Sequence, residues 1–157
     1  MKTPVKKTPV IENKKSRRNY EILETLEAGI VLTGSEVKSL RLGRAEITDA
    51  HAVPQKTELM LINLRIDPYE NAGYVNHEET RSRKLLLHKK EIIKLISRIR
   101  EKRLAVIPLK IYFNDRGKVK VLLGIGRGKK LSDQRQDERK QEAKREIERA
   151  LKEANRK

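Results

Sequence analysis

The amino-acid sequence predicts a mainly β fold, in which a small antiparallel barrel carries flanking α-helices. Apolar residues alternate along 107–113 and again along 119–125, and a short polar stretch ending at Gly117 separates the two runs. Residues 89–102 have the apolar spacing of one long amphipathic helix. Several strands combined with one main helix are typical of a small barrel of the OB type.

Charge divides the chain into a body and two basic ends. The net charge is +16, and residues 1–18 hold seven Lys or Arg against one Glu. Residues 127–157 hold twelve Lys or Arg against seven Asp or Glu. We therefore expect a disordered basic arm over 1–16, an OB-type domain over 17–128 and a basic tail over 129–157.

The predicted domain begins with strands over 19–32, with a bend at Ala28-Gly29. Ser35 is expected to be the N-cap of a short helix over 36–42. Gly43 would end this helix, because glycine adopts the left-handed conformation at low cost.

Two strands are expected next, near 46–54 and 58–66, around a turn at 54–57. Residues 67–80 predict a loop, because they include Pro, Gly and Asn without apolar periodicity. The helix over 89–102 and the alternating strand pair complete the domain.

The basic tail shows a weak helical pattern. Its apolar residues recur at helical spacing in a narrow stripe: Ala143, Ile147, Ala150, Leu151 and Ala154. An isolated helix of this kind is marginal in water. We expect the tail to be disordered when free and helical when a partner orders it.

The composition indicates a polyanion as the partner. Lys and Arg number 38 against 22 Asp and Glu, which would attract a nucleic acid or an anionic membrane. No apolar run approaches the ~20 residues that span a bilayer, and the N-terminus lacks the apolar core of a secretory signal. The chain has no cysteine, which excludes disulfides and thiolate metal sites. The cytoplasm is therefore the expected location.

The sequence does not predict an enzyme. The three histidines lack the spacing of a metal site, and the chain has neither a cysteine nucleophile nor a Gly-x-Ser-x-Gly motif. Residues 124–130 are rich in glycine but fit neither the Walker nor the dinucleotide-binding pattern. We interpret them as a strand end where small residues allow close packing. Neither a metal nor another cofactor is predicted.

Candidate contact residues lie in two segments. The short helix carries Glu36 and Lys38, and a second segment carries Arg81, Arg83 and Lys84. Glu36 has two interpretations: a helix N-terminal anion stabilised by free N–H groups, or an acceptor for amino and imino groups of RNA bases. The cations of the second segment belong either to a solvated loop or to a phosphate-binding surface.

Leu86 and His88 extend the second segment. An exposed Leu86 would pack on a base or sugar, and His88 would either contact RNA or cap the following helix together with Glu91. Four tyrosines and one phenylalanine are few for a protein that stacks splayed bases. We therefore expect a folded RNA, recognised through phosphates, 2′-hydroxyls and shape.

Three segments together resemble small protein B, the family that binds transfer-messenger RNA in bacterial trans-translation. They are residues 20–41 (YEILETLEAGIVLTGSEVKSLR), 80–87 (TRSRKLLL) and 119–130 (VKVLLGIGRGKK), in the family's order and spacing. The resemblance implies an OB-type barrel that is a monomer when free. It also implies binding to the tRNA-like domain of the RNA, and delivery of the alanylated RNA to ribosomes stalled without a stop codon.

The resemblance also implies site residues. The expected RNA-binding residues are Glu36, Lys38, Arg81, Arg83, Lys84, Leu86, His88, Gly128, Lys129 and Lys130. His88 stands where many members have asparagine. In the tail, Asp133, Gln134 and Arg135 match the family's Asp-Lys-Arg motif except at the middle residue. This tail is expected to enter the empty mRNA path near the decoding centre.

Three other classes of protein compete with this interpretation. A ribosomal protein, or another protein that binds structured RNA, would have similar basic ends. An RNA-modifying enzyme would need a nucleophile or a cofactor loop, and the sequence offers neither. A DNA-compacting protein would hold duplex DNA as well as it holds folded RNA at equal salt.

Overall fold

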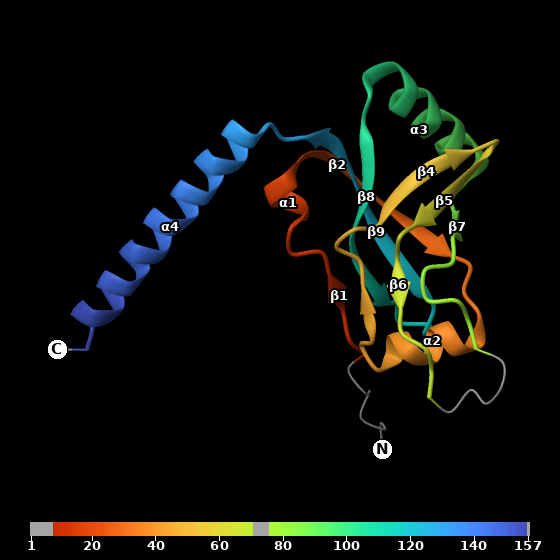
Figure 1. The fold of residues 1–157 in the computed structure, drawn as a ribbon, viewed down its shortest axis with the longest axis horizontal. Coiled ribbons are helices and arrows are strands. Elements are labelled where there is room, and N and C mark those ends of the chain that lie inside the picture. The colour runs from red at the N-terminus through yellow and green to blue at the C-terminus, as the bar shows by residue number, and fades with distance from the viewer. Residues whose placement is uncertain (1–7, 71–75, 157) are drawn as a thin grey trace.

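A computed structural model describes residues 8–70 and 76–156, and its strands form a closed ring (Figure 1). The main sheet is antiparallel, with the order β1-β8-β4-β5-β7-β2-β9, and β9 also pairs with β8. Its strands are β1 (Ile11–Glu12), β2 (Tyr20–Ile30), β4 (His51–Gln55), β5 (Glu58–Ile62), β7 (Arg83–Leu86), β8 (Ala105–Phe113) and β9 (Val119–Gly128). The prediction of a mainly β, closed antiparallel fold with flanking helices is confirmed.

The remaining elements surround this ring. Two short strands, β3 (Ala45–Glu46) and β6 (Arg65–Ile66), form a separate pair. The helices are α1 (Ser16–Asn19), α2 (Gly34–Arg41), α3 (Lys89–Lys102) and α4 (Leu131–Ala154). In Figure 1, α3 lies above the strands and α2 below them, while α4 extends away from the body. The core inside the ring consists of aliphatic residues, among them Leu59, Leu61, Leu85, Val121 and Leu123, none of which has exposed area.

The β8–β9 hairpin forms where the alternating pattern predicted it. Its turn is closed by two backbone bonds of 2.9 Å, from the N–H of Asn114 to Lys118 O and from the N–H of Gly117 to Asn114 O. Gly117 has a φ of 76°, the left-handed conformation expected of a turn glycine. The predicted helix over 89–102 is likewise confirmed as α3.

Strands β2 and β9 form the longest pairing in the molecule, from Tyr20↔Gly128 to Gly29↔Lys120. The predicted bend at residues 28–29 is wrong, because the strand continues through both residues to Ile30. The irregularity lies earlier, where the register shifts between Ile22 and Glu24.

Gly126 allows these two backbones to approach closely. A Cβ at this position would lie 1.9 Å from the carbonyl oxygen of Glu21 and 3.1 Å from Cα of Ile22. The obstructing atoms are backbone, so a side chain cannot be accommodated by a change of rotamer. The interpretation of the glycine-rich segment as a close-packed strand end is therefore confirmed for this residue.

Replacing Gly126 by alanine is expected to lower the free energy of unfolding by about 1–3 kcal/mol, because the added methyl forces β2 and β9 apart. Urea unfolding measures this change. Gly128→Ala is the matched control, since a Cβ there would meet no atom within 4 Å. That control should change the stability by no more than about 0.5 kcal/mol. Equal losses in the two variants would contradict the steric explanation.

The N-cap of α2 lies two residues before its predicted position. Ser35 was expected at the N-cap, but Thr33 occupies it and its hydroxyl accepts a bond from the N–H of Glu36. The Glu36 carboxylate in turn accepts a bond of 2.8 Å from the N–H of Thr33, which completes a capping box. Gly43, with a φ of 72°, follows the helix as predicted.

His88 occupies the N-cap position of α3, but its side chain makes no capping hydrogen bond. Of the two roles considered for His88, the N-cap position agrees with the structure, but the capping-box-like bond does not form.

The two strands predicted near 46–54 and 58–66 are each divided. Residues 47–50 separate β3 from β4, and the N–H of Ala50 donates to Ile47 O. Asn63, with a φ of 59°, separates β5 from β6. Of the predicted loop, residues 67–70 and 76–80 form neither helix nor strand, and 71–75 lie outside the described residues.

The predicted disordered arm is wrong for residues 11–16. Ile11 and Glu12 form β1 and pair with β8. Asn13 is buried, and its side-chain amide donates to Pro108 O at 3.1 Å. The Ser16 hydroxyl, also buried, donates to Asn13 O. A strand of two residues is too short to show alternation, which is why the pattern missed it. Residues 1–7 of the predicted arm lie outside the described part.

The tail forms one continuous helix, α4, where the sequence shows helical spacing. None of its residues is buried. Ile147 and Leu151, at the centre of its apolar stripe, are both about 60% exposed.

Candidate nucleic-acid interface

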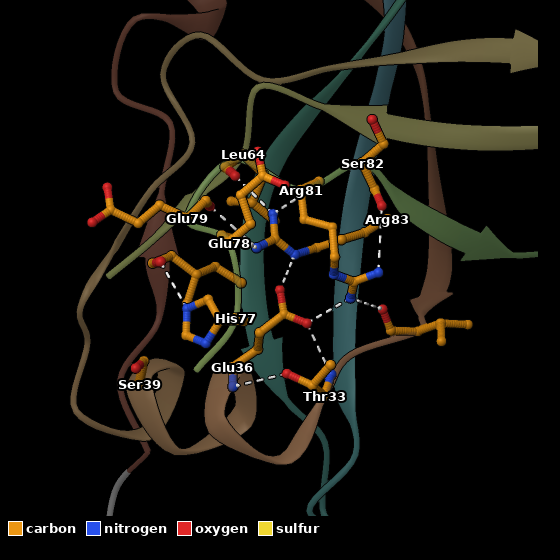
Figure 2. Close-up of polar contacts among 12 residues, drawn as sticks. Thr33, Glu36, Ser39, Leu64, His77, Glu78, Glu79, Arg81, Ser82 and Arg83 are labelled. Atoms are coloured by element: carbon orange, nitrogen blue, oxygen red, sulfur yellow. Dashed lines mark hydrogen bonds and ion pairs between the residues drawn. The ribbon is translucent and has the colours of Figure 1, made fainter. Parts of the chain in front are cut away.

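Two arginines converge on Glu36 at the start of α2 (Figure 2). One carboxylate oxygen accepts from Nη2 of Arg81 at 2.6 Å and from the N–H of Thr33. The other oxygen accepts from Nε of Arg83. The capping box fixes the carboxylate on the helix, and the carboxylate then positions the two guanidinium groups.

Arg83 has no exposed area, and it fixes the segment before β7. Its guanidinium donates to the carbonyl oxygens of Leu64 at 2.7 Å and Arg81 at 2.9 Å. It also donates to those of Glu79 at 3.2 Å and Glu78 at 3.4 Å. One buried side chain therefore holds the backbone of residues 78–81, which carries Arg81.

The charges of this cluster are stabilised by their mutual contacts. Burial alone would raise the pKa of Glu36, but the bonds from Thr33, Arg81 and Arg83 outweigh it and hold the pKa below the ordinary value of 4.5. Burial lowers the pKa of Arg83, and the Glu36 carboxylate offsets part of that effect. With Glu36 ionised, the cluster keeps one net positive charge, and the Arg81 side chain is 34% exposed.

This geometry corrects the expectation that Glu36 and Arg83 touch RNA directly. Neither side chain has any exposed area, so neither can reach a ligand in this structure. Of the two interpretations of Glu36, the helix N-terminal anion agrees with the structure. Arg81 is the member of the cluster that faces solvent.

A groove surrounds Leu86, the exposed leucine at the end of β7. Leu86 is 49% exposed and lies against Gly29, where an added Cβ would be 3.2 Å from the leucine Cβ. Two adjoining hollows of about 340 and 430 Å³ share Gly29, Leu86 and Lys120. The first also has Lys118 in its wall, and the second has His88. The predicted residues Leu86 and His88 therefore meet in one groove.

Sequence reasoning missed Lys118 and Lys120 as members of this groove. The signal for Lys120 was the alternation of β9, in which it lies between Val119 and Val121, both of which pack in the core. Lys118 precedes this strand by one residue. Two further predicted residues, Lys84 and Lys38, lie outside the lining of this groove and have partners of their own. Lys84 pairs with Glu58 at 3.0 Å, and Lys38 lies 5.4 Å from the centre of the Tyr69 ring.

The structure separates the predicted RNA-binding residues into two groups. Gly128 pairs with Tyr20 at the first end of β2, while Leu86 pairs with Gly29 near the other end. Nine residues of strand at about 3.3 Å each place these ends about 30 Å apart. Gly128, Lys129 and Lys130 therefore belong to a second surface beside α1.

The second surface carries the root of the tail. The N–H of Lys129 donates to Asn19 O at 2.8 Å, and its Nζ donates to Arg17 O at 2.9 Å. The Gln134 side chain donates to Lys129 O at 3.3 Å, so the residue that departs from the family's tail motif contacts the body. Asp133 and Arg135, the flanking residues of the motif, are exposed.

Two other kinds of feature are absent from the described part of the chain. Across residues 8–70 and 76–156, no three His, Asp or Glu side chains are grouped so that they could hold a metal ion. Over the same residues, no helix has the length and apolar character needed to cross a membrane.

Comparison with known proteins identifies the family. Residues 10–153 match the family model described as "SmpB protein". The SsrA-binding protein of Desulforamulus reducens is 53% identical over 126 residues, which are 80% of this chain and 78% of that protein. The SsrA-binding protein of Thermus thermophilus is 53% identical over 128 residues, which are 82% of this chain and 89% of that protein.

A solved structure described as "tmRNA-SmpB: a journey to the center of the bacterial ribosome" contains a similar chain. The two chains are 54% identical with a TM-score of 0.66, over 78% of this chain and 86% of the other. The family match, the sequence identity and the shared fold agree. The chain belongs to the SmpB protein family.

Proposed function

We propose that this protein binds the tRNA-like domain of transfer-messenger RNA and delivers that RNA to stalled ribosomes. The relatives are SsrA-binding proteins, and the similar solved chain is described in a complex of tmRNA and SmpB in the ribosome. The observation that carries the proposal for this chain is the groove at Leu86, which combines an exposed apolar side chain with Lys118 and Lys120.

Recognition proceeds by fit to a folded RNA. The Leu86 side chain packs against a base or ribose, and the two lysines contact phosphates on either side. Glu36 and Arg83 hold the segment that presents Arg81, so this cation enters the interface without an ordering cost. His88 lines the same groove and supplies hydrogen bonds.

The protein acts by binding rather than by catalysis, in the cytoplasm where its proposed partners are found. The body binds the RNA, and α4 is the segment that enters the mRNA path of the ribosome. The exposed stripe around Ile147 and Leu151 supports this assignment, because it presents apolar surface that a partner would cover.

Neutralising the groove lysines tests the RNA-binding surface. Lys118→Gln with Lys120→Gln should lower the slope of log K against log salt by about 1.4–1.8, since each phosphate contact contributes about 0.7–0.9. Lys94→Gln with Lys102→Gln, on α3, removes the same charge from outside the groove and is the control. The measurement is fluorescence anisotropy with a tRNA-like RNA at several salt concentrations. Equal slopes for the two double variants would contradict the assignment.

The identity of the RNA is tested by pull-down from a bacterial lysate, followed by RNA sequencing. One dominant RNA with a tRNA-like end is expected. Co-sedimentation with ribosomes at near-unit stoichiometry, with ribosomal RNA as the captured species, would favour a ribosomal protein instead.

A further inference from the structure

A further groove, the α3 groove, lies between α3 and the tip of the β4–β5 hairpin (Figure 1). Its volume is about 360 Å³, and most of the surface that it exposes is apolar. The hairpin contributes Lys56 and Thr57, and the helix contributes Ile93, Ile96 and Arg100. The groove is therefore an apolar hollow with a cation on each wall.

Ile93 is exposed although the helix does not need an apolar residue at this position. Its side chain is 57% exposed, which is more than the 49% of Leu86. The buried stripe of α3 already consists of Ile92, Leu95 and Ile96. A lysine or a glutamate in place of Ile93 would suit the helix equally well. Its exposed surface is therefore available for a partner to cover.

Lys56 is placed in the groove by a strained turn. Gln55 of β4 pairs with Glu58 of β5, so the turn between them has only two residues. Lys56 has a φ of 55°, a left-handed conformation that asparagine or glycine adopts at lower cost. A lysine that is kept in a strained conformation points to a use for its side chain.

The two cations of the groove are not neutralised by acids of the body. Within residues 8–70 and 76–156, neither Lys56 nor Arg100 takes part in an ion pair. The acid in the lining is Glu101, whose carboxylate accepts a bond of 3.3 Å from the Ser97 hydroxyl. The lining therefore keeps one net positive charge, and it offers ammonium and guanidinium groups to an acidic partner.

The α3 groove is separate from the groove at Leu86. Glu91 and Arg98 lie on the other flank of the helix, where Glu91 lines the Leu86 groove and Arg98 pairs with Glu24 of β2. The residues that line the α3 groove face the β4–β5 turn instead. A partner in the α3 groove therefore leaves the surface around Leu86 open.

We propose that the α3 groove binds an acidic segment of a partner protein, in which bulky apolar side chains lie between carboxylates. The apolar side chains cover Ile93, and the carboxylates pair with Lys56 and Arg100. RNA fits the groove less well, because none of the described residues that line it is aromatic and able to stack on a base. A phosphate backbone would also leave the apolar surface uncovered.

Three peptides test the chemistry of the occupant. The probe has two central leucines with two glutamates on each side, and the comparison peptides carry serines for the leucines or glutamines for the glutamates. In NMR titrations at physiological salt, the probe should shift the amide signals of Thr57, Ile93 and Ser97. Each comparison peptide should bind at least about fivefold more weakly. Equal binding of the leucine and serine peptides, or shifts that include none of these three amides, would overturn the proposal.

Lys56→Asn separates the binding of the peptide from the stability of the fold. Asparagine suits the left-handed turn, so the melting temperature of this variant should be no lower than that of the wild type. Loss of the cation should weaken binding of the probe about two- to fivefold. The control is Lys102→Asn, because Lys102 is exposed and lines neither groove. Equal affinities of the two variants for the probe would overturn the proposal.

Ile93→Ser removes the apolar contact without removing a buried side chain. It should weaken binding of the probe about tenfold. The serine variant should therefore bind the leucine and serine peptides with similar affinity, whereas an undiminished preference for the leucine peptide would place the contact elsewhere and overturn the proposal.

A tRNA-like RNA distinguishes this groove from the proposed RNA-binding surface. Lys56→Asn should change the affinity for that RNA no more than Lys102→Asn does. A larger loss in Lys56→Asn, with RNA-induced shifts of Thr57, Ile93 and Ser97, would make the groove an RNA surface and overturn the proposal. Loss of the salt-slope difference at Lys118 and Lys120 would count against the proposed function alone, because the peptide measurements contain no RNA.

Discussion

Replacing Glu36 by glutamine is expected to lower the free energy of unfolding by about 3–5 kcal/mol, the cost of removing one partner from a buried ion pair. Arg83 has no exposed area, and Glu36 is the carboxylate that contacts it. Glutamine keeps the shape of the side chain but leaves the guanidinium without its counter-ion. Urea unfolding at neutral pH measures the loss.

Glu46→Gln provides the control for this variant. Glu46 is exposed and takes part in none of the ion pairs formed by the described residues, so the same change of charge should alter the stability by no more than about 0.5 kcal/mol. A loss at Glu36 as small as that at Glu46 would show that the buried pair contributes nothing.

The same carboxylate predicts how the stability responds to acid. The pKa of Glu36 is lowered in the folded protein, so the unfolded chain binds its proton at a higher pH than the folded chain does. The contribution of Glu36 is complete above its ordinary pKa of 4.5 and is lost as the pH falls from there through the folded value. The wild-type protein should therefore lose stability below pH 4.5 more steeply than Glu36→Gln does. Parallel curves would contradict the lowered pKa.

The Glu36→Gln variant should change RNA affinity in the direction opposite to the one its gain in net positive charge would give. Removing a negative charge from a basic protein ought to tighten binding to a polyanion. Because Glu36 positions Arg81, we expect Glu36→Gln to weaken binding to a tRNA-like RNA under conditions where the variant is folded. Tighter binding would show that Glu36 merely repels phosphate.

The fold was predictable wherever the signal is local. Residues close together in the chain determine the alternation along β8 and β9, the left-handed Gly117 and the helical spacing of α3. The closure of the ring depends instead on contacts between distant segments, such as Ala52↔Val106, which no periodicity records. Strand β1 was missed for a related reason, since its two residues gain their structure from β8.

For the cluster around Glu36, the sequence indicated the charged residues but not their roles. Glu36, Arg81 and Arg83 were selected as charged residues, and charged residues are rarely fully buried unless paired. The pairing brings together α2 and the start of β7 with the residues just before it, which lie more than forty residues apart in the chain. The one local signal was the spacing of Thr33 and Glu36, which fits a capping box and places Glu36 at the start of the helix.

The division of the predicted RNA-binding residues into two surfaces also could not be predicted from the sequence. The segments at 80–88 and 128–130 were both basic, and nothing local distinguishes them. Their separation follows from the length of β2, which pairs with one group near each end. The long strand thus holds the two groups of predicted RNA-binding residues about 30 Å apart.

Deleting residues 131–157 is expected to abolish peptide tagging and to leave binding to a tRNA-like RNA largely unchanged. The deletion removes no buried residue, so the body should remain folded. Tagging is measured by reconstituted translation on a message without a stop codon. A full-length variant with the sequence of α4 scrambled keeps the composition and charge. If the tail acted only as a polycation, this scrambled variant would still support tagging.

The direction in which RNA affinity changes after the deletion separates two roles of the tail. The tail could act as a polycation that attracts RNA, or as a helix whose acids pair with cations at the α1 end. Residues 131–157 hold nine Lys or Arg against seven Asp or Glu, so a purely electrostatic tail predicts weaker RNA binding after deletion. The ion pairs of Asp137 with Lys129 and of Glu138 with Arg18 predict the opposite for the α1 end, because the deletion removes both acids and leaves both cations in place. Binding of a short RNA duplex should therefore tighten in the truncated protein. A weaker affinity for that duplex, together with lost affinity for the tRNA-like RNA, would show that tail and body form one binding surface.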